Sequence, residues 1–361
     1  LISILLAIYV FKTVTLISNK LLGLLSSSIL IIQPLFLAQS TLILPEILVA
    51  LLTLISIYYL LEEKYIKYLF ISTLFVITKE TAIVVPVIIL LYQFIKNKSI
   101  KDSLKFALPI LVLGLFFTIQ RLQNGWFLFP FHVEIIALKS GLVITNIIKS
   151  FYFLFIAQGK FVFIIPFVFQ GYLLFKNQIN NKEKAFTSIS LLVISSSIIL
   201  ISSLYLMNRY YLFILPFILI LSVLGIKNLI SLNSKFKLIT PLFLLPIFFI
   251  SKQNTFNIDA DLGYKNCIAA NRKTYSFLTD NNYSNKKGYC HFSIIRAFES
   301  SRLGYNHKNI DFDLNEQFDN DIEYAIEINP DGWNRDLSIW SNFRLVKTIK
   351  EGNFEILIFE K

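Results

Sequence analysis

Long runs of apolar residues, separated by short polar loops, dominate the first 250 residues of the chain. From Ser251 onward the pattern changes, and Asp, Asn and Lys alternate with much shorter apolar runs. A helix that crosses a bilayer needs about 20 mostly apolar residues. The pattern therefore predicts a polytopic α-helical membrane domain over residues 1–250 and a small extracytoplasmic α/β domain over residues 251–361.

The apolar runs predict about nine membrane spans and the end of an earlier one at residues 1–11. The nine cover residues 21–38, 47–61, 67–78, 81–95, 106–120, 160–176, 186–206, 210–226 and 238–250. When these spans alternate in direction, most lysines fall on one side, which the positive-inside rule assigns to the cytoplasm. These are Lys12, Lys20, Lys64, Lys67, Lys96, Lys98, Lys101, Lys105, Lys176, Lys182, Lys184, Lys227, Lys235 and Lys237.

The alternation requires residues 65–95 to form two short helices that turn at Lys79 and Glu80. A single span there would move the lysines of residues 96–105 to the outer side. Helices shorter than a bilayer are tolerated where they line a cavity in the protein. We therefore expect the turn at Lys79 to lie at an outward-facing cavity.

The alternation also requires residues 134–158 not to cross the bilayer. This segment mixes charged residues with Ile, Leu and Phe, so we expect an amphipathic helix that lies at the outer interface. The alternative is an ordinary span that buries Lys149. That arrangement would place residues 251–361 in the cytoplasm.

Composition supports a membrane protein, because hydrophobic residues make up 55% of the chain and charged residues only 16%. The net charge of +11 does not predict a nucleic-acid partner, because the lysines are scattered through short loops and form no single stripe. The chain begins at Leu1, inside an apolar run without a start Met. We expect it to be a fragment that lacks its true N-terminus.

Six ionisable residues lie beside or between the predicted spans, and the lysine topology places all of them at the outer face. They are Glu46, Lys79, Glu80, Arg121, His132 and Arg209. A charged side chain at the centre of a membrane helix costs about 2.5 to 3.5 kcal/mol on insertion scales, so such residues usually mark functional sites. The six are therefore candidate site residues.

Lys79, Arg209 and Tyr210 have the chemistry of a phosphate site. A Lys ammonium meets phosphate as a point charge, and an Arg guanidinium offers a fork of permanent donors. The Tyr210 ring is available for stacking, with a hydroxyl at its edge. The alternatives are a structural ion pair between spans for Lys79 and an interfacial aromatic belt for Arg209 and Tyr210.

The other charged candidates have competing explanations. Glu46 follows a Pro at the start of a span, where an acidic residue is also an ordinary helix-start signal. Arg121, Trp126 and His132 belong to an aromatic, Pro-broken loop that suits a sugar or lipid. His132 alone is more typical of a polar loop residue than of a metal ligand.

The polar tail holds both cysteines, Cys267 and Cys290, and either a disulfide or two free thiols is compatible with their positions. No glycine-rich phosphate loop, Ser/His/Asp pattern or paired-Cys metal motif occurs. The tail's pattern predicts a helix, a strand and a hairpin, at residues 259–280, 323–328, and 344–349 with 354–359.

Several short motifs, taken in order, resemble the membrane glycosyltransferases of the GT-C superfamily. The most similar branch is the bacterial one related to protein O-mannosyltransferases and lipid A aminoarabinose transferase. The resemblance covers nearly the whole chain, and each motif alone is short. The motifs are Gln33–Ser40 with Pro45 and Glu46, Thr78–Thr81, Gly125 and Trp126 with Pro130 and His132, Arg209 and Tyr210 with Pro216, Asp261–Tyr264 and Leu303–Tyr305.

The resemblance implies transfer of a sugar from a polyprenyl-phosphate donor to a lipid, glycan or protein acceptor at the outer face of a bacterial plasma membrane. It implies that Lys79 and Arg209 hold the donor phosphate, and that Glu46 and Glu80 line the acceptor side or bind a divalent metal. The main catalytic acid of the family would lie upstream of Leu1. We therefore expect this chain alone to be inactive.

Two other classes share this hydropathy. A transporter or lipid flippase would also carry charges in broken helices, although the sequence shows no internal repeat. An O-antigen polymerase or ligase would place its main charges in one large external loop, whereas the polar residues here gather at the C-terminus. Both remain alternatives to the transferase.

Overall fold

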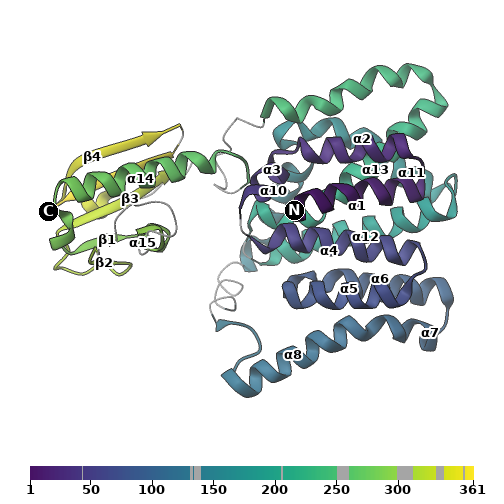
Figure 1. The fold of residues 1–361 in the computed structure, drawn as a ribbon, viewed down its shortest axis with the longest axis horizontal. Helices are drawn as coiled ribbons and strands as arrows, with labels where there is room; N and C mark the ends of the chain where they lie inside the picture. Colours follow the sequence, from purple (N-terminus) through teal and green to yellow (C-terminus); the bar gives the residue numbers. More distant parts are fainter. Residues whose placement is uncertain are drawn as a thin grey trace. The chain divides into compact units, whose positions relative to one another are not determined.

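The computed structural model describes the chain except for residues 43, 131–132, 134–139, 205, 250–259, 299–311, 331–336 and 353. The chain divides into two compact units, Leu1–Ile250 and Ser251–Lys361. The first is built from helices, and the second combines helices with a five-stranded sheet (Figure 1). Each unit has its own packed interior, so each is described by itself.

The helical unit begins with α1 (Ile2–Ile17), α2 (Lys20–Ile31), α3 (Pro34–Thr41) and α4 (Pro45–Leu61). Asn19 caps α2 by accepting a hydrogen bond from the backbone N–H of Leu22 at 3.0 Å. The predicted span 21–38 is broken, because α2 and α3 are bent by 69° where Pro34 starts a new helix. The bend places α3 across the end of the unit from which α4 starts (Figure 1).

The next segment contains α5 (Tyr65–Thr78), the 3₁₀ helix η1 (Glu80–Ile83), α6 (Val84–Asn97), α7 (Ile100–Leu104), η2 (Lys105–Ala107) and α8 (Leu108–Asn124). The predicted turn at Lys79 and Glu80 is confirmed. Lys79 has an extended backbone, with φ −156° and ψ 121°, and it ends α5. Figure 1 shows α7 at one end of the unit and α3 at the opposite end. The lysine-rich loop around α7 is therefore distant from the start of α4.

The remaining helices are α10 (Val143–Phe155), η4 (Ala157–Phe163), α11 (Ile164–Phe175), α12 (Asn181–Ser203), η5 (Asn208–Phe213), α13 (Leu215–Leu232) and η6 (Ser234–Phe249). The predicted span 210–226 thus starts as a 3₁₀ helix. The predicted span 238–250 is described through Phe249 as part of η6, which contains Pro241 and Pro246. Neither proline can donate a backbone hydrogen bond, which disfavours a regular α-helix there.

Helix α10 is amphipathic, as predicted, but two of its polar residues point into the protein. Asn146 and Ser150 are buried, whereas Ile144 and Ile148 are exposed. Asn146 donates to the backbone carbonyl of Ser202 at 3.1 Å, which ties α10 to the end of α12. Residues 134–139 of the predicted interfacial segment lie outside the described residues. Thr145 and Lys149 are exposed beside the isoleucines, so the outer face of α10 mixes polar and apolar residues.

Among the described residues, five helical segments are long and apolar enough to cross a membrane, or six if the bent pair α2–α3 is one span. They are Glu80–Asn97, Ile100–Asn124, Ala157–Phe175, Asn181–Ser203 and Leu215–Leu232. The sequence predicted about nine spans. Three of the nine predicted spans account for the difference from six, because they lie in α4, α5 and η6, which have only 17, 14 and 16 residues. The outer surface is rich in exposed Leu, Ile and Phe, which is compatible with a bilayer.

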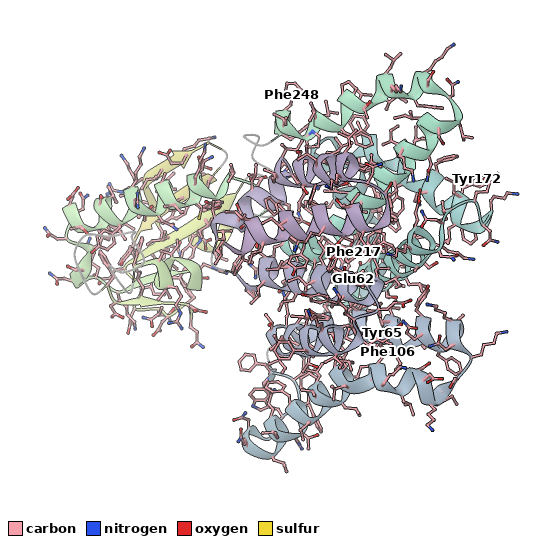
Figure 2. All side chains as sticks on the ribbon, turned by 45° about the vertical axis from the view of Figure 1, so that its right-hand side comes forward. Glu62, Tyr65, Phe106, Tyr172, Phe217 and Phe248 are labelled. Carbon is pink, nitrogen blue, oxygen red and sulfur yellow. The ribbon has the colours of Figure 1, made fainter. Side chains whose placement is uncertain are left out.

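Helix α13 forms the centre of the helical unit, and its residues Leu215–Ile226 are almost entirely buried. Figure 2 shows Phe217 in the interior, whereas Phe248 of η6 lies at the periphery. The backbone of Gly225 packs directly on α11, where an added Cβ would overlap the carbonyl oxygen of Pro166. Glycine is required there because no side chain fits between the two helices.

A buried polar cluster joins α11, α12 and α13. Glu183, which is 1% exposed, accepts hydrogen bonds from Gln170 at 2.9 Å and from Asn228 at 3.0 Å through Oε1. Its other oxygen, Oε2, lies 3.3 Å from Lys227 Nζ. The bonds compensate for the cost of removing the carboxylate from water. This cluster therefore fixes the relative positions of three helices.

The C-terminal unit contains α14 (Tyr264–Asp280), η7 (Tyr283–Asn285), α15 (Phe292–Phe298) and η9 (Leu337–Trp340) beside one sheet. The strands are β1 (Gly288–Cys290), β2 (Leu314–Asn315), β3 (Tyr324–Pro330), β4 (Arg344–Glu351) and β5 (Phe354–Glu360), in the order β2-β1-β3-β5-β4. Strands β1, β2 and β3 are parallel, and β5 pairs antiparallel with both β3 and β4. The predicted helix, strand and hairpin are all confirmed.

The two cysteines are free, so no disulfide forms between them. Cys290 is fully buried in the core of the C-terminal unit, and Cys267 on α14 is partly buried against the same core. Burial raises the pKa of the Cys290 thiol to about 12 and that of the Cys267 thiol to about 11. Both side chains therefore act as small apolar core residues.

Candidate functional site

Three of the predicted site residues meet at the end of the helical unit where α4 begins. Pro45 is at the first position of α4, which places Glu46 in the first helical turn. Lys79 ends α5, and Arg209 belongs to η5, the irregular segment between α12 and α13. Regular helix starts, ends or is interrupted at these three positions, so the side chains of Glu46, Lys79 and Arg209 can meet at one point.

Glu46 is the centre of this group, which we call the Glu46 cluster: Glu46, Lys79, Arg209 and Tyr210. Lys79 Nζ donates a hydrogen bond to Glu46 Oε1 at 2.9 Å. Arg209 Nε lies 3.3 Å from the same oxygen. The ring of Tyr210 faces the two cations, with its centroid 3.8 Å from Lys79 Nζ and 5.5 Å from Arg209 Cζ. One carboxylate oxygen thus receives two positive charges beside an aromatic face.

The cluster lies mostly away from solvent. The side chain of Glu46 is 5% exposed, and those of Lys79 and Arg209 are 17% and 24% exposed. Removing such charges from water is costly unless they are paired, so the ion pairs are needed to hold the group in place. Glu46 Oε2 is buried and has no hydrogen-bond partner in the described part of the chain. This oxygen is free to accept a proton or a further hydrogen bond.

A small pocket lies at the cluster. Its walls are Glu46, Val49, Lys79, Thr81, Ala82, Ile201, Leu204, Tyr210 and Phe213. Its cavity volume is about 20 Å³, which is enough for about one water molecule. Apart from the charged residues and Thr81, the walls are mostly apolar, so charges inside interact more strongly than they would in water. A ligand larger than water must displace one of the walls.

The structure places the remaining predicted residues outside the cluster or beside it. Glu80 follows Lys79 and begins η1, where it is partly buried. Arg121 is exposed near the end of α8, with Cζ 5.7 Å from the ring centroid of Phe127. Trp126 packs edge-on against Phe129, at 5.6 Å between ring centroids. His132 lies outside the described residues.

Sequence reasoning missed the buried charge of Lys160, as it did that of Glu183. Lys160 in η4 is 1% exposed, although it lies at the start of a predicted span. Its ammonium donates to the carbonyl of Phe153 at 2.9 Å and to Gln158 Oε1 at 3.1 Å, and it lies 4.0 Å from the ring centroid of Phe153. The signal was present, because a Lys inside an apolar run is itself unusual.

The ring of Phe153 also connects Lys160 to the segment that carries Arg209. It packs against the ring of Tyr211 in η5, with 5.9 Å between centroids. The Tyr211 hydroxyl forms a short hydrogen bond with Ser150 Oγ. Lys160 therefore helps to position η5 but does not itself reach the Glu46 cluster.

The described residues contain no group of three or more His, Cys, Asp or Glu side chains that could hold a metal ion. Glu46 and Glu80 thus have no third ligand of these types in the part of the chain that is described. No protein-family model matches the chain, and no curated protein or solved structure matches it either. The functional argument therefore rests on the Glu46 cluster and on the short motifs in the sequence.

Proposed function

We propose that the protein is a glycosyltransferase of GT-C type, which moves a sugar from a polyprenyl-phosphate donor to a lipid, glycan or protein acceptor at the outer face of a bacterial plasma membrane. One observation carries the proposal: Lys79 Nζ and Arg209 Nε both reach a single carboxylate oxygen, at 2.9 and 3.3 Å. A carboxylate oxygen stands in for a phosphate oxygen, because both are anionic and accept hydrogen bonds from Lys and Arg at similar donor–acceptor distances. The two cations are thus arranged to bind one anionic group.

The chemistry follows from the leaving group. When the bond between the sugar and the lipid phosphate breaks, negative charge develops on the phosphate oxygen. Lys79 and Arg209 would stabilise that charge, and the mostly apolar walls of the pocket would strengthen the interaction. The reaction needs no nucleotide-binding fold, since the donor is carried by a lipid. The site's location at the end of a helical unit with an apolar outer surface suits such a donor.

Glu46 has two roles in this proposal. In the absence of donor it is the counter-ion that keeps Lys79 and Arg209 in place. When the donor binds, its phosphate replaces the Glu46 carboxylate as the partner of Lys79 and Arg209. Glu46 then turns toward the acceptor, and its Oε2, which has no hydrogen-bond partner in the described structure, can accept a hydrogen bond from it. A divalent metal would need ligands beyond Glu46 and Glu80.

The pocket must open for this exchange, because about 20 Å³ cannot hold a sugar phosphate. The walls that can move are the irregular segments, since η1 and η5 are short 3₁₀ helices. Their backbone hydrogen bonds are weaker than those of the α-helices that flank them. Donor binding would therefore displace η1 or η5 and leave α4 in place.

The test uses membranes that contain the full-length protein and a radiolabelled polyprenyl-phosphate sugar. We expect Lys79→Ala and Arg209→Ala to lower sugar transfer by about 100-fold or more, the size of effect seen when one stabilising donor is removed. Lys98→Ala is the matched control, because Lys98 is exposed beside α7. Unchanged transfer in both site variants would remove the phosphate assignment. Movement of the whole lipid across the bilayer without sugar transfer would favour the flippase.

A further inference from the structure

We infer that the C-terminal unit binds an anionic glycan in a groove between α14 and the edge strand β4. The groove has a volume of about 530 Å³ and is lined by Arg272, Lys273, Ser276, Phe277, Asp280, Lys347, Thr348, Ile349 and Lys350. Pockets for small ligands typically have volumes of about 300 to 1,000 Å³. This site is separate from the Glu46 cluster, and it does not depend on the proposed transfer reaction.

The charges of the groove favour an anion. Four of its nine lining residues are Lys or Arg, and only Asp280 is acidic. Lys273 forms an ion pair with Glu351 at the rim. Among the described residues, neither Lys347 nor Lys350 forms an ion pair with a carboxylate. Lys347 is exposed and shares a face of β4 with Ile349, which packs toward α14, so its ammonium is available to a ligand in the groove. Lys350 lies at the edge of the groove and its side chain points to the opposite face of the sheet.

The uncharged residues of the groove favour a sugar over a simple ion. Phe277 on α14 is partly exposed, and Lys347 Nζ lies 5.8 Å from its ring centroid. The hydroxyl group of Ser276 lies on the same lining. A sugar ring has apolar C–H faces and a hydroxylated rim, so an aromatic face beside a hydroxyl group suits it. With the lysines added, the lining is complementary to a sugar that carries carboxylate or phosphate groups.

Two simpler explanations account for only part of this arrangement. Lysines on an edge strand prevent sheet-to-sheet aggregation, but that role does not require Arg272 and Lys273 of α14 to face the same groove. Proteins that bind an anionic membrane surface typically insert exposed apolar side chains from a flat or convex face. Here the lining lies between a helix and a strand, and its apolar residues Phe277 and Ile349 are partly or fully buried, so they form no exposed anchor. A chain of sugars fits the groove better than a bilayer does.

The experiment measures binding of fluorescent oligogalacturonate, a carboxylated glycan, to the full-length protein in nanodiscs of neutral phosphatidylcholine. Maltooligosaccharide of equal length is the uncharged comparison, and inorganic phosphate is the simple-ion comparison. We expect only the charged glycan to bind measurably. Its binding should weaken when salt rises from about 0.1 M to about 1 M, because exposed charges are then screened over about 3 Å instead of about 10 Å.

The site variant is Lys273→Gln with Lys347→Gln, and the matched control is Lys265→Gln with Arg344→Gln. Both pairs remove two exposed cations from α14 or β4, but Lys265 and Arg344 lie outside the groove. We expect the site variant to bind about fivefold more weakly, as for the loss of two exposed charge contacts. Unchanged melting temperatures in both variants would show that the fold is intact.

Four outcomes would overturn the inference. They are equal binding of the neutral glycan, equal binding of inorganic phosphate, an equal loss of affinity in the control variant, and binding to phosphatidylglycerol vesicles without binding to the charged glycan. The first would indicate recognition by stacking alone, and the second a simple ion site. The third would indicate a general charge effect of the unit, and the fourth a membrane-binding surface. A selective loss in the site variant alone supports the groove.

Discussion

Replacing Glu46 with Gln tests whether the Glu46 cluster is held together by its charges. The change keeps the size of the side chain but removes the negative charge that Lys79 and Arg209 share, at 2.9 and 3.3 Å from one oxygen. Lys79 and Arg209 then lose the carboxylate that they share, in a pocket with mostly apolar walls. We expect the helical unit to lose stability.

The magnitude follows from burial. Breaking a buried ion pair by removing one partner costs about 3 to 5 kcal/mol, because the remaining charge is left unpaired. Lys79 and Arg209 keep 17% and 24% of their side-chain surface, so water still reaches them. The ring of Tyr210 also continues to face Lys79. We therefore expect a loss at the lower end of the range, about 3 kcal/mol.

The assay is thermal unfolding in detergent, followed by intrinsic Trp fluorescence. Glu62→Gln is the matched control, since Glu62 pairs with Lys64 at 2.7 Å but half of the Lys64 side chain is exposed. Such a surface pair contributes about 0 to 1 kcal/mol, so the control should melt close to the unmodified protein. Adding Lys79→Met to Glu46→Gln should recover part of the loss, because the Lys79 ammonium that lost the Glu46 carboxylate is then removed as well. Equal melting temperatures for Glu46→Gln and Glu62→Gln would refute the reasoning.

Two further predictions concern packing and the cysteines. Gly225→Ala should lower the melting temperature strongly, because the added methyl group overlaps the Pro166 carbonyl. Gly114 has open space around it, so Gly114→Ala should leave the melting temperature unchanged or slightly raised. Equal effects of the two changes would contradict the close contact between α11 and α13. Maleimide should label Cys290 and Cys267 slowly near neutral pH, because their pKa values of about 12 and 11 keep both thiols protonated. Denaturant should make both thiols reactive. Mass spectrometry would follow the labelling, and rapid modification of Cys290 in the folded protein would contradict its burial.

Charge and periodicity together predicted much of the architecture. The lysines of residues 96–105 required a turn at Lys79 and Glu80, and α5 ends there. Alternating apolar and polar residues in the tail predicted the β4–β5 hairpin, which the structure contains. These features depend on local sequence, in which the pattern of side chains directly determines the element. Strands β1 and β2 were missed because runs of three and two residues are too short to show a period.

Contacts between distant segments could not be predicted in the same way. Lys79 and Glu46 are 33 residues apart, and nothing in either motif shows that their side chains meet. For α10, the sequence predicted an amphipathic helix, but not that Asn146 turns inward to donate to the Ser202 carbonyl. The burial of Lys160 likewise depends on the carbonyl of Phe153, a backbone group that no composition analysis detects.

The central position of α13 has a consequence for how the protein is made. This helix is buried between α1, α2, α11 and α12, yet it occupies residues 215–232, near the end of the helical unit in the sequence. The earlier helices leave the ribosome first and have no partner for the faces that α13 later covers. They must therefore remain loosely associated in the bilayer until residue 232 has been synthesised. Final packing of the helical unit is a late event, and a chain interrupted before α13 would expose surfaces that membrane proteases and chaperones recognise.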